Sequence, residues 1–484
     1  MTEPKRHRHA FVAARRSRGW SQFVAAERVG VALTTWQRWE RGDVTPGLPQ
    51  VSRIADAFGV SVPEALTWIE EHEPTEKQEL TGMQEPADGL GPAAAGQDET
   101  FVPWLTAQIT HPSLADTVER ASELWRWGMD PSRRAVLAAL PYVPAALHEW
   151  VASFTLDPGP DSRAHVGSSG RAVGIDDVHR VLDAVDAFVD MDHRYGGKLT
   201  RPAIVYYLDT EVAALLNGRY TDEVGSQLMS AAAAMTALAG WESYDLAEHG
   251  SAQAHYGQAL ALAKAADDPL TSAWILATAS QQAIDLHQPE LAVRLARAAQ
   301  LASHQVNASP RVRAVLLLRE ARAAAVKVEL AETPDRHTIS RVERLLGAAE
   351  DTFAAVTPDD DDPQWAHDLS HAEFTAESGC VWRMIGSYQR AEDSARYALA
   401  KFDDSFVRSR QFNMIHRGQA LVELGELDEA LSVTRQALRM SINQASARSV
   451  ALLASFNQQL DAHAREPRVK QWREQLRAAV PDAA

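Results

Sequence analysis

The sequence has a single cysteine, Cys380, and no long apolar run. One cysteine excludes an intramolecular disulfide and a cysteine-rich zinc module, and it is typical of proteins in a reducing compartment. A membrane-spanning helix needs about 18 or more consecutive apolar residues, and no such run is present. The first twenty residues are basic, but no apolar segment of the kind found in signal peptides follows them. These absences predict a cytoplasmic protein without a membrane partner.

The sequence also lacks the short motifs that carry common enzyme chemistry. It has no HExxH, GxSxG or dinucleotide-binding fingerprint, and the segment GSSGRAVG at 167–174 lacks the Lys-Ser/Thr ending of a phosphate loop. His367 and His371 have the spacing of a helical metal pair, but no third ligand follows at helical spacing. We therefore expect no catalytic residues, no metal and no cofactor. A body that modifies a metabolite stays open as an alternative.

The composition that remains is that of a large helical protein. With 484 residues and 45% apolar side chains, the chain is long enough for two or more domains. It is rich in Ala, Leu, Arg and Glu and poor in β-branched runs and hairpin turns, which predicts an all-α fold. The expected order is a compact domain of five short helices at 1–72, a flexible linker at 73–100, a helical region packing on the repeats at 101–200, a helical-repeat domain at 201–465 and a C-terminal helix or tail at 466–484.

Charge is distributed unevenly along the chain. Residues 1–41 contain nine Lys/Arg and three Asp/Glu, whereas the formal net charge of the whole chain is −17. A basic end on an acidic body is typical of a protein that binds phosphate groups at that end, because the acidic remainder repels nucleic acid. Arginine-rich helices that are merely solvated are the alternative, and charge alone does not decide between the two.

Two tryptophans three residues apart, Trp36 and Trp39, occur in the polar segment GVALTTWQRWERGD at 30–43. On a helix they lie on one face, and that face is expected to be buried. The opposite face is then exposed and carries Thr34, Gln37, Arg38 and Arg41. These side chains have the donors and acceptors that suit base edges and phosphates. The pair therefore predicts a reading helix whose rotation is fixed by its two indoles.

The preceding residues complete a pattern that resembles the XRE/Cro-like helix-turn-helix family. Gln22, Ala26 and Gly30 stand at spacings of four, as needed for a helix start, a close helix contact and a turn. The segments RGWSQ, WERG and IADAFGVSVPEAL extend the resemblance from about residue 11 to residue 69. This family usually has aliphatic residues where the two tryptophans stand. The resemblance implies a five-helix domain that inserts one helix into the major groove of double-stranded DNA.

The resemblance also implies roles for individual side chains. Gln22 would contact a backbone phosphate or an adjoining base, and Leu33 would reach at most a thymine methyl. Arg38 is the first candidate for a guanine contact, with an ion pair to a nearby acid as the alternative. The residues implied to face the major groove are Leu33, Thr34, Gln37 and Arg38. Those assigned to phosphates are Arg41, Arg15, Arg16, Lys5, Arg6 and Arg8.

Small residues recur at a fixed spacing in the C-terminal half of the chain. Gly379, Gly386, Ala391, Ala395 and Ala398 are followed 39 residues later by Gly418, Gly425, Ala430, Thr434 and Ala437. Such residues let two antiparallel helices approach closely with a glycine in the turn, which resembles the tetratricopeptide repeat. Weaker copies contain Ala252, Tyr256 and Ala259, then Ala292, Ala296 and Ala299, then Val342, Leu346 and Ala349. The expected fold is a helical-hairpin solenoid, with an irregular helical bundle as the alternative.

The order of domain, linker and repeat body resembles the peptide-pheromone receptors of Gram-positive bacteria (the RRNPP group) and large actinobacterial regulators. This implies a transcriptional regulator whose body senses a short peptide and forms a homodimer, so that its operator is palindromic. The first-helix positions implied for the peptide are Trp274, Gln281, Glu373, Arg383, Phe412 and Gln419, with Asn413 beside them. A body that docks a protein partner or binds a small molecule is the alternative.

Overall fold

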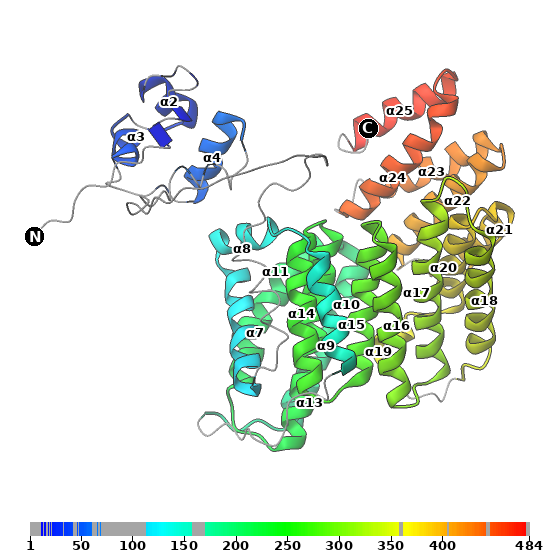
Figure 1. Cartoon of the computed structure of the whole chain (residues 1–484), viewed down its shortest axis with the longest axis horizontal. Helices are drawn as coiled ribbons and strands as arrows, with labels where there is room; N and C mark the ends of the chain where they lie inside the picture. Colours follow the sequence, from blue (N-terminus) through cyan, green and yellow to red (C-terminus); the bar gives the residue numbers. More distant parts are fainter. Residues whose placement is uncertain are drawn as a thin grey trace, which may run out of the picture. The chain divides into compact units, whose positions relative to one another are not determined.

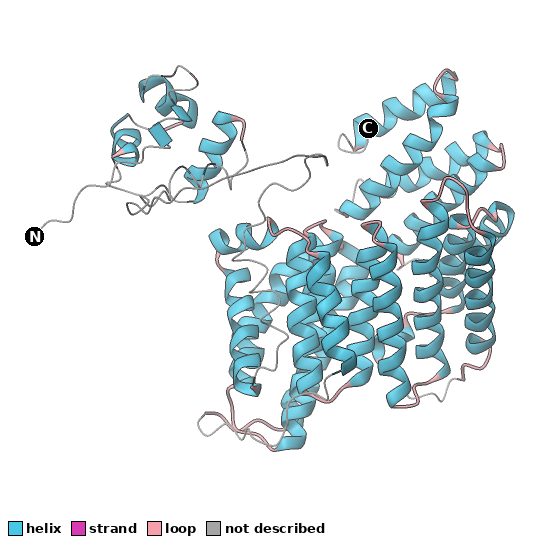
Figure 2. Ribbon diagram, viewed as in Figure 1, coloured by secondary structure: helices cyan, strands magenta, loops and turns pink. Residues whose placement is uncertain are grey.

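The computed structural model of the chain consists of helices joined by turns and loops (Figures 1 and 2), and no strand occurs among the residues it describes. These residues are 11–12, 14–15, 18, 20, 22–31, 33–41, 46, 48–60, 65, 68, 113–156, 170–357, 362–403, 406–441 and 446–480. The all-α prediction is confirmed. The chain divides into two compact units, 1–95 and 96–484. The predicted linker at 73–100 lies outside the described residues.

The N-terminal unit contains three described helices: α2 (Gln22–Val29), α3 (Leu33–Glu40) and α4 (Leu48–Phe58). Residues 11, 12, 14 and 15 are also helical, as are residues 65 and 68, at the positions of the first and fifth predicted helices. Between α2 and α3, Gly30 has a φ of 71°. Glycine adopts this left-handed conformation without steric cost, so the chain turns sharply there and brings α3 against α2.

The body begins with a layer of helices that lies against the repeats. Its elements are α7 (Leu114–Met129), α8 (Pro131–Ala138), α9 (Pro144–Leu156), α10 (Ile175–Tyr195), α11 (Gly197–Tyr207), the π-helical turn η1 (Leu208–Val212) and α12 (Ala213–Leu216). The start of α7 is fixed by a capping box, in which Ser113 and Asp116 satisfy each other's backbone amides. Helix α7 contacts α14, α9 contacts α16, and α10 contacts α13. Residues 101–200 therefore include the helices that cover the first hairpins.

The rest of the body is a series of antiparallel helical hairpins, as predicted (Figure 1). The first three pair α13 (Asp222–Asp245) with α14 (His249–Ala265), α15 (Pro269–Asp285) with α16 (Pro289–Gln305), and α17 (Pro310–Glu329) with α18 (Arg336–Phe353). After the short α19 (Gln364–His367), α20 (His371–Met384) pairs with α21 (Tyr388–Lys401), and α22 (Val407–Glu423) with α23 (Leu427–Ser441). The chain ends with α24 (Ala447–Gln459), the 3-10 turn η2 (Leu460–His463) and α25 (Pro467–Ala479). None of the described helices combines the length and apolar character needed to cross a membrane.

Left-handed residues mark the turns between the hairpin helices. Gly386 and Gly425 have φ angles of 79° and 83°, as expected for glycines in the turns of α20/α21 and α22/α23. In the earlier turns the left-handed positions are filled by residues with side chains, namely Ala247, Asp267, His287 and Asn307. These four stand exactly twenty residues apart in sequence, so every helix from α13 to α16 ends at the same point of its repeat. The repeat is therefore visible in the backbone even where glycine is missing.

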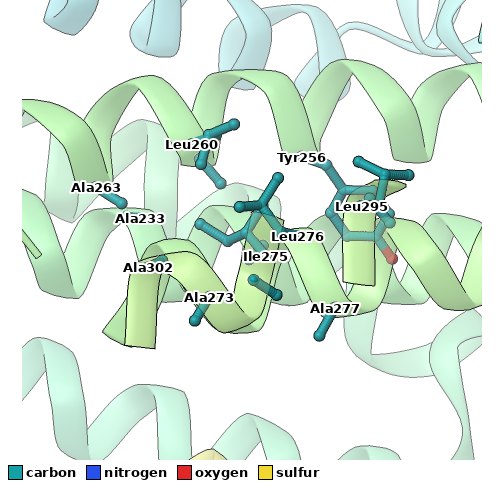
Figure 3. Close-up of a cluster of buried hydrophobic side chains, with 14 of the residues drawn as sticks. Ala233, Tyr256, Leu260, Ala263, Ala273, Ile275, Leu276, Ala277, Leu295 and Ala302 are labelled. Carbon is teal, nitrogen blue, oxygen red and sulfur yellow. The ribbon is translucent and has the colours of Figure 1, made fainter. Parts of the chain in front are cut away.

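Small side chains bring the two helices of each hairpin together. The alanines and Tyr256 of the weaker repeat copies are fully buried, and so are Val342 and Ala349 of the most divergent one. Figure 3 shows part of this core, in which the small Ala233, Ala263 and Ala302 belong to the same group of buried side chains as Leu260, Leu276, Leu295 and Tyr256. Small and large residues together fill the space between helices at the density of a protein interior.

Gly418 offers a direct test of this packing. A Cβ at Gly418 would overlap Thr434 Cγ2 of the facing helix, whereas a Cβ at Gly347, within α18, would meet no atom within 4 Å. We expect Gly418→Ala to lower the free energy of unfolding by roughly 1–3 kcal/mol through overpacking. We expect Gly347→Ala to raise it by about 0.5–1 kcal/mol, because alanine loses less backbone entropy in a helix. Thermal or urea unfolding of the two variants measures both, and equal effects would contradict the close approach of α22 and α23.

Candidate DNA-binding and effector sites

Both tryptophans of α3 point into the N-terminal unit. Trp36 is 0% and Trp39 is 3% exposed, which confirms the predicted inward face. The Trp36 ring stacks on Phe58 with an interplanar angle of 5°, and its centroid lies 4.8 Å from that of Phe11. Burying two indoles in so small a core fixes the rotation of α3, because aromatic side chains supply most of the apolar area there.

The other side of α3 remains at the surface. Gln37 is half-buried, and Arg38 and Arg41 are exposed. Leu33 and Thr34 stand in the first turn of α3, and their side chains lie outside the described residues. Among the residues that the structure describes, no hydrogen bond or ion pair uses the Arg38 side chain, so the ion pair considered as its alternative role is not formed there. The reading face is therefore polar and open, as the tryptophan pattern indicates.

A buried carboxylate, Glu40, connects α3 to the two segments before it. Glu40 Oε1 lies 2.5 Å from Arg15 Nε and accepts a 2.9 Å hydrogen bond from Trp36 Nε1. Its other oxygen accepts a 2.6 Å hydrogen bond from Gln22 Nε2, at the start of α2. Gln22 Oε1 accepts in turn from Gln37 Nε2 at 3.3 Å. The core and the reading face are thus joined through one carboxyl group.

This network changes the role of Arg15. We assigned Arg15 to a phosphate, but its side chain is 9% exposed, pairs with Glu40 and donates to the carbonyl of Trp20 at 2.7 Å. An arginine enclosed in this way holds the domain together and is not presented to a DNA backbone. The periodicity of the sequence could not show this, because Glu40 lies 25 residues away. Arg16, Lys5, Arg6 and Arg8 lie outside the described residues.

The Glu40 pair makes the stability of the N-terminal unit depend on acid. Burial by itself would raise the pKa of Glu40, but hydrogen bonds from Arg15, Gln22 and Trp36 outweigh it and hold the pKa below its usual value of 4.5. A depressed pKa in the folded state stabilises the fold above the unfolded pKa. That contribution is lost as the pH falls from about 4.5 through the folded pKa.

We expect Glu40→Gln to destabilise the N-terminal unit by about 3 kcal/mol, because it leaves the Arg15 charge buried without a counter-charge. Hydrogen exchange of peptides covering residues 22–58 in the full chain measures this loss. The double variant Arg15→Met with Glu40→Leu is the control, since it removes both charges and should recover much of the stability. Exchange rates unchanged by Glu40→Gln would contradict a supporting role for the pair.

The structure separates the seven predicted effector residues into two groups. All lie on α15, α20 or α22, the first helices of their hairpins. Asn413 is 3% exposed and donates to the carbonyl of Ala395 at 2.9 Å, and Gln419 is 4% exposed and donates to Ser455 Oγ at 3.2 Å. These two bonds join helices, so both amides are structural. Trp274, Glu373, Arg383 and Phe412 are partly exposed, and Gln281 is buried.

Three of the remaining candidates have specific surroundings. Arg383 forms a 2.8 Å ion pair with Glu329 of α17, so its charge is already balanced within the body. Burial raises the pKa of the Glu373 carboxyl to about 7, so that side chain is partly protonated at neutral pH. The guanidinium carbon of Arg448 lies over the Phe412 ring, 5.0 Å from the ring centroid.

Sequence reasoning missed a larger set of charged residues, which lie on α10, α13, α15, α17, α20, α22 and α24. We call this set the inner charged network: Asp192, Glu242, Asp245, Asp285, Arg319, Arg322, Glu377, Arg408 and Arg448. Arg408 binds both oxygens of Asp192 at 2.8 and 2.6 Å, and Arg448 Nε lies 3.2 Å from Asp285. Burial first, and the Asp192 carboxylate second, raise the pKa of Glu242 well above its usual value. The sequence did contain one signal for this network, namely charged residues within otherwise apolar helices, as in Glu242 and Asp245 of α13.

A cysteine and a histidine meet beside this network without the features of a catalytic pair. Cys380 Sγ lies 3.7 Å from His416 Nε2, and His416 Nδ1 lies 3.1 Å from Gln419 Oε1. Burial raises the pKa of the thiol and lowers that of the imidazole to about 3. A nucleophilic cysteine needs the opposite shifts. The pair is therefore neutral at physiological pH.

The two histidines considered as a metal pair, His367 and His371, have other contacts. His367 Nε2 lies 3.2 Å from the carbonyl oxygen of Asp362, and His371 stacks on Phe353 at a centroid distance of 5.8 Å. In the described part of the chain no group of three or more His, Cys, Asp or Glu is placed to hold a metal ion.

Comparison with known proteins identifies the N-terminal unit. Residues 11–68 match a family described as Helix-turn-helix domain. No curated protein matches the chain. The matched range contains α2, α3, α4 and the Glu40 network. The chain therefore carries an N-terminal helix-turn-helix domain and is a DNA-binding regulator.

Proposed function

We propose that this protein is a cytoplasmic, sequence-specific transcriptional regulator that reads double-stranded DNA with α3 and senses an effector with its repeat body. The observation that carries the DNA part is the orientation of α3, with Trp36 and Trp39 buried and Arg38 exposed. The DNA-reading residues proposed are Gln22, Leu33, Thr34, Gln37 and Arg38. Arg41, Arg16 and the arm residues Lys5, Arg6 and Arg8 are proposed to bind phosphates.

Arg38 is the side chain proposed to specify a base pair. An arginine donates two parallel hydrogen bonds to the O6 and N7 atoms of guanine, and this pairing discriminates by roughly 1–3 kcal/mol. Gln37 precedes Arg38 on the helix and is held by Gln22, so this part of the reading face is ordered before DNA arrives. Preorganisation lowers the entropy cost of binding.

We expect Arg38→Ala to reduce the ratio of specific to non-specific DNA affinity on the order of 10- to 100-fold, corresponding to the loss of one bidentate base contact. Binding-site selection followed by gel-shift titration measures the ratio. Removal of residues 1–9 is the contrasting variant, because loss of phosphate contacts weakens all DNA alike and flattens the salt dependence. Unchanged site preference in Arg38→Ala would discard the assignment.

For the body we propose that the effector is a short peptide, that the repeats are of the tetratricopeptide type and that the protein acts as a homodimer on palindromic operators. Support comes from Trp274, Glu373 and Phe412, which remain partly exposed on three first helices of the stacked hairpins, α15, α20 and α22. Stacked helical hairpins present extended surfaces suited to peptides. The effector can act only through its different affinity for two arrangements of the protein.

The effector proposal is tested on DNA from upstream of the protein's own gene. We expect a cognate peptide to change the apparent Kd for this DNA by about tenfold, a typical coupling between two sites. Gel shifts with and without candidate peptides measure the change, and native mass spectrometry shows whether a ligand is purified with the protein. A protein bound at the body with no small ligand detected would favour the alternative, a docking scaffold; a non-peptide ligand would favour a metabolite sensor.

A further inference from the structure

The acids around Arg319 of α17 already have partners. Arg322 Nη1 donates to both oxygens of Glu377, at 3.1 and 3.0 Å. Asp285 accepts from Gln281 Nε2 at 2.9 Å and from Arg448 Nε at 3.2 Å, and the hydroxyl of Tyr244 donates to it as well. These carboxylates are therefore satisfied without Arg319.

Arg319 itself is a cation without a partner in the described part of the protein. Its Nε and Nη1 atoms are buried and make no hydrogen bond, although the residue as a whole is half-buried, and its guanidinium forms no ion pair or ring contact with the described residues. Burial is the main influence on it and lowers its pKa, with Glu377 acting in the opposite direction. An enclosed charge is nearly always paired, because the loss of hydration is costly.

An acceptor without a partner lies on the neighbouring helix. Gln281 of α15 is 2% exposed, and its Oε1 atom makes no hydrogen bond although its Nε2 atom is held by Asp285. Helices α15 and α17 are in contact, and Asp285 influences both Arg319 and Gln281. Solvent reaches this region, since the side chains of Asp285 and Glu377 are 29% and 32% exposed. The region is therefore not closed to solvent.

We propose that Arg319 and Gln281 form a binding site for a ligand that carries a carboxylate next to an N–H group. The guanidinium of Arg319 donates to the two carboxylate oxygens, for which its planar fork is suited, and Gln281 Oε1 accepts from the N–H. An acylated amino acid and the C-terminal end of a peptide share this chemistry. The site rests on the proposal that the body senses an effector, and it names the group of the effector that is recognised.

Stability distinguishes this role from a structural one. Arg319→Gln removes no hydrogen bond and no ion pair of the described residues, and it removes an unpaired charge, so its melting temperature should equal or exceed that of the unchanged protein. Arg322→Gln breaks the pair with Glu377 and should melt lower. If Arg319→Gln melts as low as Arg322→Gln, the side chain is structural and the proposed site is wrong.

Binding is tested on the full chain with two pairs of probes: N-acetylglycine against N-acetylglycinamide, and acetyl-triglycine with a free against an amidated C-terminus. We expect the carboxylates to bind at least tenfold more tightly than the amides in saturation-transfer NMR titrations, and Arg319→Gln to abolish this preference. Arg313→Gln, at an exposed position of the same helix, should retain it. Tighter binding of the triglycine probe identifies a peptide end, and tighter binding of N-acetylglycine identifies a small acid.

Equal binding of carboxylates and amides, or an unchanged preference in Arg319→Gln, would overturn the site. A preference that depends on Arg319, together with DNA binding that no ligand alters, would support the site and refute effector control. An effector that alters the DNA binding of the unchanged protein and of Arg319→Gln equally would support effector control and refute the site.

Discussion

The buried carboxylate of Glu40 is the contact on which the arrangement of the DNA-binding domain depends. It is bonded to a side chain before α2, to the first residue of α2 and to an indole of its own helix. The same oxygens that satisfy the core arginine therefore hold Gln22, which in turn holds Gln37. The hydrogen bonds to Arg15 and Trp36 in the core and those through Gln22 to Gln37 at the reading face depend on the same carboxyl group. Folding of the core therefore also aligns the reading face.

Polar contacts also join distant parts of the body. Arg408 of α22 binds Asp192 of α10, and Ser446, just before α24, donates to Asp245 of α13 at 2.9 Å. The apolar side chains form one large cluster that runs to Ile385 and a separate one that begins at Met414. The last hairpins are thus attached to the first helices by ions and hydroxyls more than by apolar packing. These contacts are buried, with Asp192 and Ser446 each 3% exposed, so breaking them would be costly and they hold the last hairpins to the first helices.

The features predictable from sequence were those that repeat at helical spacing. Two tryptophans three residues apart predicted the buried face of α3. Small residues four and three apart predicted the packed faces of the second helices of the hairpins. Both patterns follow the helical period, which places such residues on one face of a helix. The failures share a different cause. Arg15, Asn413 and Gln419 look like exposed polar residues in the sequence, but each meets a partner 18 to 36 residues away that only the fold brings near. The inner charged network was missed for the same reason, since Arg408 and Asp192 are 216 residues apart.

The distribution of charge limits how an effector can act on DNA binding. The basic residues gather in the first 41 positions, and the chain as a whole carries a formal charge of −17. An acidic body placed against a phosphate backbone would raise the energy of the complex, so we expect the DNA contacts to come from the helix-turn-helix domain. A ligand enclosed in the body then cannot add a contact to DNA. If the protein acts as the proposed homodimer, an effector would change DNA affinity by favouring the arrangement of the body in which two reading helices match two half-sites, and dimer geometry would be the quantity that it controls.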